Sequence, residues 1–169
     1  MKKVSVLVVF SVVALVTGCY KEVSFDIKPY IEFKDLRKEI RLDQFSGSKK
    51  DSVILTIKFQ DGDGDLGLNE EEKKTAVTNQ DFNYIVRIFR QKKGVFQEVI
   101  PDVTYSGFFP RLKVDNKKGP IEGTLDYSFV YFQDFTPKKD SLKYQVTIKD
   151  RSGNLSNTIE SKVIILNEF

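Results

Sequence analysis

The chain has 169 residues, of which 40% are hydrophobic and 30% are charged, a composition typical of one folded domain with short additions. The formal net charge is +3 and there is no histidine, which excludes imidazole-dependent catalytic triads and histidine-ligated zinc. The single cysteine excludes an intramolecular disulfide and a thiolate metal cluster.

The N-terminus has the parts of an export signal. Lys2 and Lys3 precede an apolar run from Val4 to Val16, which is shorter than the roughly 20 residues that span a bilayer. The run ends in the sequence VTGC at residues 16–19, which resembles the lipobox of bacterial lipoproteins. This resemblance implies that Cys19 carries a diacylglycerol and becomes the mature N-terminus. An ordinary signal peptide with an incidental cysteine is the alternative.

These features predict three parts: a lipoprotein signal peptide at residues 1–18, a lipid-anchored tether at 19–29 and a folded domain at 30–169. In proteobacteria an aspartate after the cysteine favours retention in the inner membrane. Because Tyr20 stands there, we expect an anchor in the outer membrane, facing the periplasm or the cell surface.

The charge of the mature chain bears on its partners. Loss of the signal peptide removes two of the 27 basic residues and none of the 24 acidic ones. The nearly neutral remainder has no basic face for nucleic acid. The expected partners are therefore the membrane, through the anchor, and an unknown protein or glycan.

Alternating apolar and polar residues predict a chain made mainly of β-strands. The clearest strand is 52–60, where four apolar residues from Val53 to Phe59 fall on one face. Residues 70–74 are expected either to form one helical turn or to stay irregular. Turn residues recur between the apolar runs. The other expected strands are 30–33, 82–90, 95–100, 124–132, 142–149 and 158–166.

About seven strands with regularly spaced turns and no long helix indicate an all-β fold. We expect an immunoglobulin-like antiparallel β-sandwich, with a closed barrel as the alternative. Residues 124–132 are apolar on both faces towards their end, which suits a central strand of a sandwich.

The most informative stretch is DGDGDLG at residues 61–67, directly after the clearest strand. Carboxylates at alternate positions can turn together toward one hard cation, and calcium takes about six to eight oxygen ligands. The register resembles a calcium loop of EF-hand type, although a preceding strand excludes the EF-hand fold, which a helix enters. The expected calcium ligands are Asp61, Asp63, Asp65, Gly67 through its carbonyl, Asn69 and Glu72.

Leu66 departs from this register, because EF-hand loops place the glycine of a sharp turn there. The departure weakens the assignment of Asn69 and Glu72 more than that of the aspartates. A solvated hairpin tip and a magnesium site stay open as alternatives, although magnesium retains its waters and seldom uses an all-protein loop. Asp150 and Asn154 add ligands only if their turn lies beside the loop, and an ordinary turn is the simpler interpretation.

Three stretches together resemble uncharacterised lipoproteins of the Bacteroidota, which have a lipobox and a DGDGD-[I/L]-G element in an all-β domain. These stretches are YIEF at 30–33, the run 52–67, and DRSGNLSN at 150–157. The resemblance covers most of the mature chain, but only the lipobox and the acidic loop are specific. It implies the fold and the location, and no established activity.

We therefore expect a lipid-anchored cell-envelope protein with a calcium-stiffened loop, which acts as a structural or binding module and has no catalytic residues. One alternative is capture of a glycan or protein by surface aromatics, although filling of the core is the simpler role for such rings. Another is a glycosidase with paired carboxylates, although the acidic residues gather in one loop. The aromatic residues considered for capture are Tyr105, Phe108, Phe109, Tyr127 and Tyr131.

Overall fold

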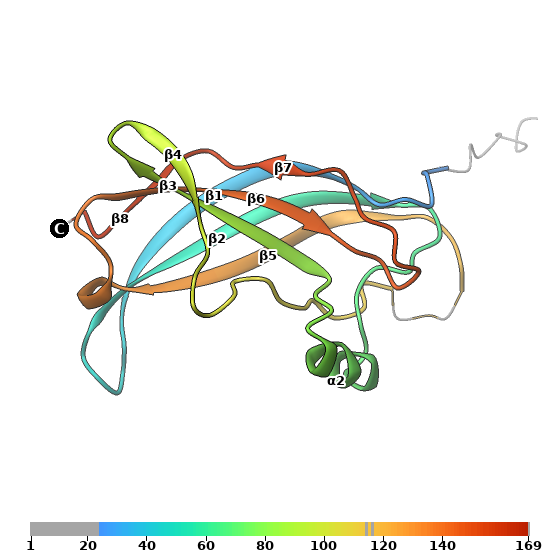
Figure 1. Cartoon of the computed structure of the whole chain (residues 1–169). Coiled ribbons are helices and arrows are strands. Elements are labelled where there is room, and N and C mark those ends of the chain that lie inside the picture. The colour runs from blue at the N-terminus through green and yellow to red at the C-terminus, as the bar shows by residue number, and fades with distance from the viewer. Residues whose placement is uncertain (1–23, 114, 116, 169) are drawn as a thin grey trace, which may run out of the picture.

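The computed structural model describes residues 24–113, 115 and 117–168. Within them, two antiparallel sheets pack face to face, and a short helix projects at one end (Figure 1). This arrangement confirms the all-β sandwich that the sequence predicts. The predicted signal peptide, Cys19 and the start of the tether lie outside the described residues.

One sheet has three strands in the order β1-β2-β5, and the other has the order β4-β3-β6-β7, with β8 also paired to β6. The chain crosses between the sheets after β2, β4 and β5, as expected for an immunoglobulin-like sandwich. The elements are β1 (Tyr30–Leu42), β2 (Lys49–Asp61), α2 (Glu70–Asn79), β3 (Tyr84–Lys92), β4 (Val95–Val99), β5 (Ile121–Phe132), the 3-10 helix η1 (Gln133–Phe135), β6 (Asp140–Ile148), β7 (Ile159–Glu160) and β8 (Ile164–Leu166).

Most strand ends differ from the sequence prediction by one to three residues, and two segments differ more. The first strand continues to Leu42 because its whole length pairs with β2. The segment expected as one strand at 158–166 is instead two short strands. Between them the Ser161 hydroxyl takes the place of a backbone acceptor, at 3.0 Å from the Tyr144 N–H nitrogen. The described residues of the domain therefore form eight strands rather than about seven.

The position of β5 corrects another expectation. The sequence predicts a central strand at residues 124–132, but β5 is an edge strand and β2 occupies the centre of its sheet. Val130 and Phe132 are 44% and 37% exposed. Apolar residues on both faces of this strand therefore do not reflect burial on both faces.

Residues 70–79 form a regular helix, longer than the single turn considered from the sequence. The helix begins with a reciprocal capping box. The Asn69 side chain accepts a hydrogen bond from the Glu72 N–H, and the Glu72 carboxylate accepts one from the Asn69 N–H, both at 2.8 Å. These bonds satisfy two backbone groups that a helix start otherwise leaves unpaired.

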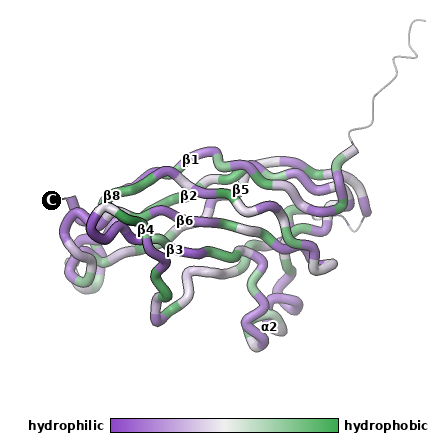
Figure 2. The backbone as a smooth tube through the Cα atoms, turned by 45° about the horizontal axis from the view of Figure 1, so that its top comes forward, coloured by the Kyte–Doolittle hydropathy of each residue, from purple (hydrophilic) through white to green (hydrophobic). Residues whose placement is uncertain are grey.

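The core between the sheets is rich in aromatic rings, and polar and apolar residues alternate along the strands around it (Figure 2). Phe129 of β5 stacks on Tyr144 of β6 with ring centroids 4.8 Å apart, which joins the two sheets. Phe108 packs against Phe82 at 5.3 Å. The other aromatics considered for capture belong to the core or pack against it: Tyr105, Phe109, Tyr127 and Tyr131.

The two ends of the sandwich contain different segments. The loop after β2, the turn after β6 and the first described residues lie at one end (Figure 1). The C-terminal segment, η1 and the hairpin between β1 and β2 lie at the other. The first of these ends therefore brings together the two turns that the sequence singled out.

Candidate metal centre

The site begins with a carboxylate on the core face of a strand. Side chains alternate between the faces of a strand, so Asp61 faces the same way as Ile57 and Phe59 of β2. Asp61 is accordingly fully buried. One carboxylate oxygen, Oδ2, accepts a hydrogen bond from the Asp65 N–H at 2.9 Å, which curls the loop back over the end of the strand.

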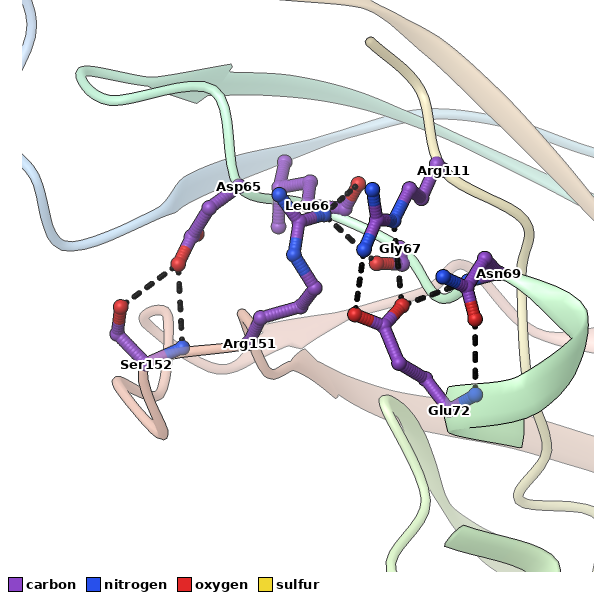
Figure 3. A network of polar contacts seen from close by, with 8 residues as sticks. All are labelled: Asp65, Leu66, Gly67, Asn69, Glu72, Arg111, Arg151 and Ser152. Atoms are coloured by element: carbon purple, nitrogen blue, oxygen red, sulfur yellow. Dashed lines mark hydrogen bonds and ion pairs between the residues drawn. The ribbon is translucent and has the colours of Figure 1, made fainter. Parts of the chain in front are cut away.

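The turn after β6 lies directly against this loop. Leu66 forms an antiparallel bridge with Asp150, and the Arg151 N–H donates to the Asp65 carbonyl at 3.3 Å. The Asp65 Oδ2 atom accepts bonds from the N–H and hydroxyl of Ser152, at 3.1 and 2.7 Å (Figure 3). The turn at 150–154 is therefore part of the site.

Carboxylates from the two sheets converge here. Asp61 and Asp65 from the β2 end and Asp150 from the β6 end each offer an oxygen, and these oxygens lie within 4.8 Å of one another. Asp150 is only 4% exposed, and its two oxygens accept bonds from the backbone and side chain of Asn154 at 2.7 and 2.8 Å. Asn154 thus orients Asp150 through its nitrogen atoms.

Three buried oxygens in the loop have no hydrogen-bond partner among the described residues. They are the Oδ1 atoms of Asp61, Asp63 and Asp65. Buried carboxylate oxygens are nearly always paired, because leaving such an atom without a donor costs free energy. Three of them in one loop point to a positively charged ligand among them.

The electrostatics of the protein chain agree with this geometry. Burial and, after it, the neighbouring charges of Asp63 and Asp65 together raise the pKa of Asp61 to about 6. Burial is also the main cause that raises the pKa of Asp150, to which Asp65 and Asp63 contribute. Both shifts are those expected when burial and like charges act on crowded carboxylates.

Of the six residues predicted as ligands, the structure brings Asp61 and Asp65 together. Asp63 lies outside this group of oxygens, although its charge acts on Asp61. The other three residues have different contacts. The Gly67 carbonyl accepts a bond from the Arg151 guanidinium at 3.0 Å. Asn69 caps α2, and both oxygens of Glu72 bond the Arg111 guanidinium (Figure 3).

Leu66 is the physical reason for this divergence. Its side chain is fully buried and its backbone bridges to Asp150, so this position is held against the turn after β6 instead of forming the sharp turn of an EF-hand loop. At Gly67, with φ of +84°, a Cβ atom would lie 2.0 Å from the Pro110 carbonyl oxygen. The glycine therefore serves a close backbone contact.

The structure adds Asp150 to the cluster, which the sequence offered only as a conditional ligand. Fold and site together define a β-sandwich with a buried carboxylate cluster between the ends of its two sheets. Comparison with protein-family models, curated proteins and solved structures found no match to this chain. No helix among the described residues is long and apolar enough to cross a membrane.

Proposed function

We propose that this protein is a lipid-anchored module of the outer cell envelope, whose sandwich is stabilised by a calcium ion bound between the ends of β2 and β6. The anchor is Cys19, and the ligands are Asp61, Asp63, Asp65 and Asp150. The protein acts as a structural or binding module for an unknown protein or glycan partner, and not as an enzyme. The observation that carries the ion site is the set of three buried carboxylate oxygens without a hydrogen-bond donor.

Calcium suits this set of donors best. The converging donors are carboxylate oxygens, which hard cations prefer. Zinc, copper, iron and nickel favour imidazole or thiolate, but the chain has no histidine and a single cysteine, at position 19. Magnesium keeps most of its waters and seldom takes several carboxylates from one protein loop.

The anchor rests on the VTGC sequence at residues 16–19 and on the resemblance to lipoproteins of the Bacteroidota. Calcium is abundant outside the cytoplasm, which agrees with this location. The glycosidase alternative is less well supported, since Asp61 and Asp150 are buried side by side rather than set across an open cleft.

Thermal unfolding of the lipidated mature protein, in chelator and in millimolar calcium, tests the ion site. We expect calcium to raise the Tm, because a ligand that binds only the folded state stabilises it by about 2.7 kcal/mol at a hundred times its Kd. Asp63→Asn is expected to abolish most of this rise. The Oδ1 atom of Asp63 has no hydrogen bond to lose, so the substitution mainly removes charge.

Asp102→Asn is the matched control, since Asp102 is an exposed carboxylate in the connection between β4 and β5. This variant should keep the full response to calcium. An unchanged melting curve of the parent protein in millimolar calcium would contradict the proposal.

A further inference from the structure

The segment that leads toward the N-terminus packs directly on the acidic loop. The Gly62 N–H donates to the Asp26 carbonyl at 2.8 Å. A Cβ atom at Gly62 would lie 2.4 Å from the Phe25 carbonyl oxygen, so only glycine permits this approach. The polypeptide therefore leaves the domain at the end that holds the carboxylate cluster (Figure 1).

The chain between this point and Cys19 is short. Phe25 is six positions after Cys19, so even fully extended this stretch spans about 20 Å. The 13 residues of β2 span about 40 Å and connect the two ends of the sandwich. A lipid on Cys19 can therefore reach the membrane only if the end with the carboxylates lies near it.

Basic side chains lie at the same end. The Gly119 N–H donates to the Asp63 carbonyl at 3.2 Å, and the Lys113 ammonium donates to the Gly119 carbonyl at 3.3 Å. Lys117 and Lys118, next to Gly119, are exposed. Exposed lysines close to a bilayer are attracted to anionic lipid phosphates, and a cation among the aspartates reduces the opposing repulsion.

We infer that this end of the sandwich faces the membrane, with Lys117 and Lys118 at the phosphates of anionic lipids. The hairpin between β1 and β2 then points away from the bilayer, and the long axis of the sandwich stands upright on it. The inference rests on the lipid anchor of the proposed function. In this orientation the opposite end of the sandwich, with η1 and the C-terminal segment, is exposed to partners in solution.

Site-directed spin labelling tests this orientation in the lipidated protein, reconstituted in vesicles of phosphatidylcholine and phosphatidylglycerol. A lipidated Cys19 has no free thiol, so an introduced cysteine is the only labelling site. Thr124→Cys places a nitroxide on the exposed side of β5 near the carboxylate end, and Ser46→Cys places one at the exposed tip of the distant hairpin.

We expect a nickel-chelating lipid to relax the nitroxide at position 124 several-fold more strongly than the one at position 46. Equal relaxation at the two labels would mean that the sandwich lies on its side, and stronger relaxation at position 46 would mean that it is inverted. Either result would overturn the inference. Vesicle binding is measured before the relaxation of the nitroxides. Protein that washes off the vesicles would refute the lipid anchor and not the orientation.

A second comparison tests the lysines in the protein labelled at position 124. Lys117→Gln with Lys118→Gln should weaken relaxation in anionic vesicles and leave it unchanged in neutral ones. The matched control is Lys92→Gln with Lys93→Gln, two exposed lysines of the β3–β4 hairpin at the other end. An equal loss in both double variants, or none in either, would refute contact of Lys117 and Lys118 with lipid.

Discussion

Replacing Asp61 with asparagine should change the stability of the domain in opposite directions with and without calcium. Asparagine keeps an oxygen that can accept the hydrogen bond from the Asp65 N–H, which spans 2.9 Å in the structure. It removes the charge that Asp63 and Asp65 oppose. In chelator this relief should stabilise the protein, whereas in calcium the loss of a charged ligand should destabilise it.

The pKa of Asp61 sets the size of the effect without calcium. Burial and then the neighbouring aspartates raise it from 3.8 to about 6. An acid whose pKa is higher in the folded state than in the unfolded state lowers the free energy of unfolding as the pH rises from the unfolded-state pKa to the folded-state pKa. For Asp61 this loss is at most about 3 kcal/mol and is complete above pH 6. Asp61→Asn avoids this cost, so its Tm at neutral pH should rise by at most about 10 °C. The gain should shrink as the pH falls below about 6 and disappear below a pH of about 3, where Asp61 is protonated in both states.

Urea unfolding in chelator and in calcium, at neutral and acidic pH, measures both the expected stabilisation without calcium and the expected destabilisation with it. In calcium at a hundred times the parent Kd, Asp61→Asn should lose up to about 2.7 kcal/mol of ligand stabilisation. Asp102→Asn should change little in any condition. Equal destabilisation by Asp61→Asn in chelator and in calcium would refute the reasoning, because Asp61 would then be a purely structural acceptor.

Two further substitutions test neighbouring parts of the loop. Glu72→Gln should cost about 1 kcal/mol, since it weakens the capping box and the ion pair with Arg111, but the Tm rise in calcium should persist. Loss of that rise would place Glu72 among the ligands. Gly67→Ala should destabilise the domain by at least about 3 kcal/mol in urea titrations, because the new Cβ would meet the Pro110 carbonyl at 2.0 Å. Gly153→Ala, with a φ of +89° but nothing within 4 Å, should cost only about 1–2 kcal/mol, and equal costs would contradict the packing argument.

Local sequence patterns were sufficient to predict most of the fold. The period of two in residues 52–60 identifies the central strand, and it also places Asp61 on the core face once the strand is extended by one residue. The exposed edge position of β5 could not be predicted in this way, because pairing partners depend on the topology of the whole chain.

The proposed ligands also differ in whether local sequence or the topology of the whole chain brings them together. Asp61 and Asp65 are close together, with Asp63 between them in the chain, because they alternate within a few residues, a local property of the sequence. Asp150 joins them through contacts between its turn and the loop, including the bridge between Leu66 and Asp150, which form when the two sheets pack. Glu72 was assigned by analogy with a loop that turns sharply at its sixth position, and the buried Leu66 prevents that turn.

The separation of the carboxylates along the chain has a consequence for the folded protein. Asp61 and Asp150 are 89 positions apart, yet their carboxylates lie within 4.8 Å. A disulfide of that span would restrict the unfolded chain, whereas an ion that binds only the folded state dissociates on unfolding and leaves the unfolded chain unrestricted. Its stabilisation therefore depends on the calcium concentration relative to the Kd. In a chain with one cysteine, the proposed ion would be a reversible link between the ends of the two sheets. This link forms and breaks with the calcium concentration and the pH rather than with the redox potential.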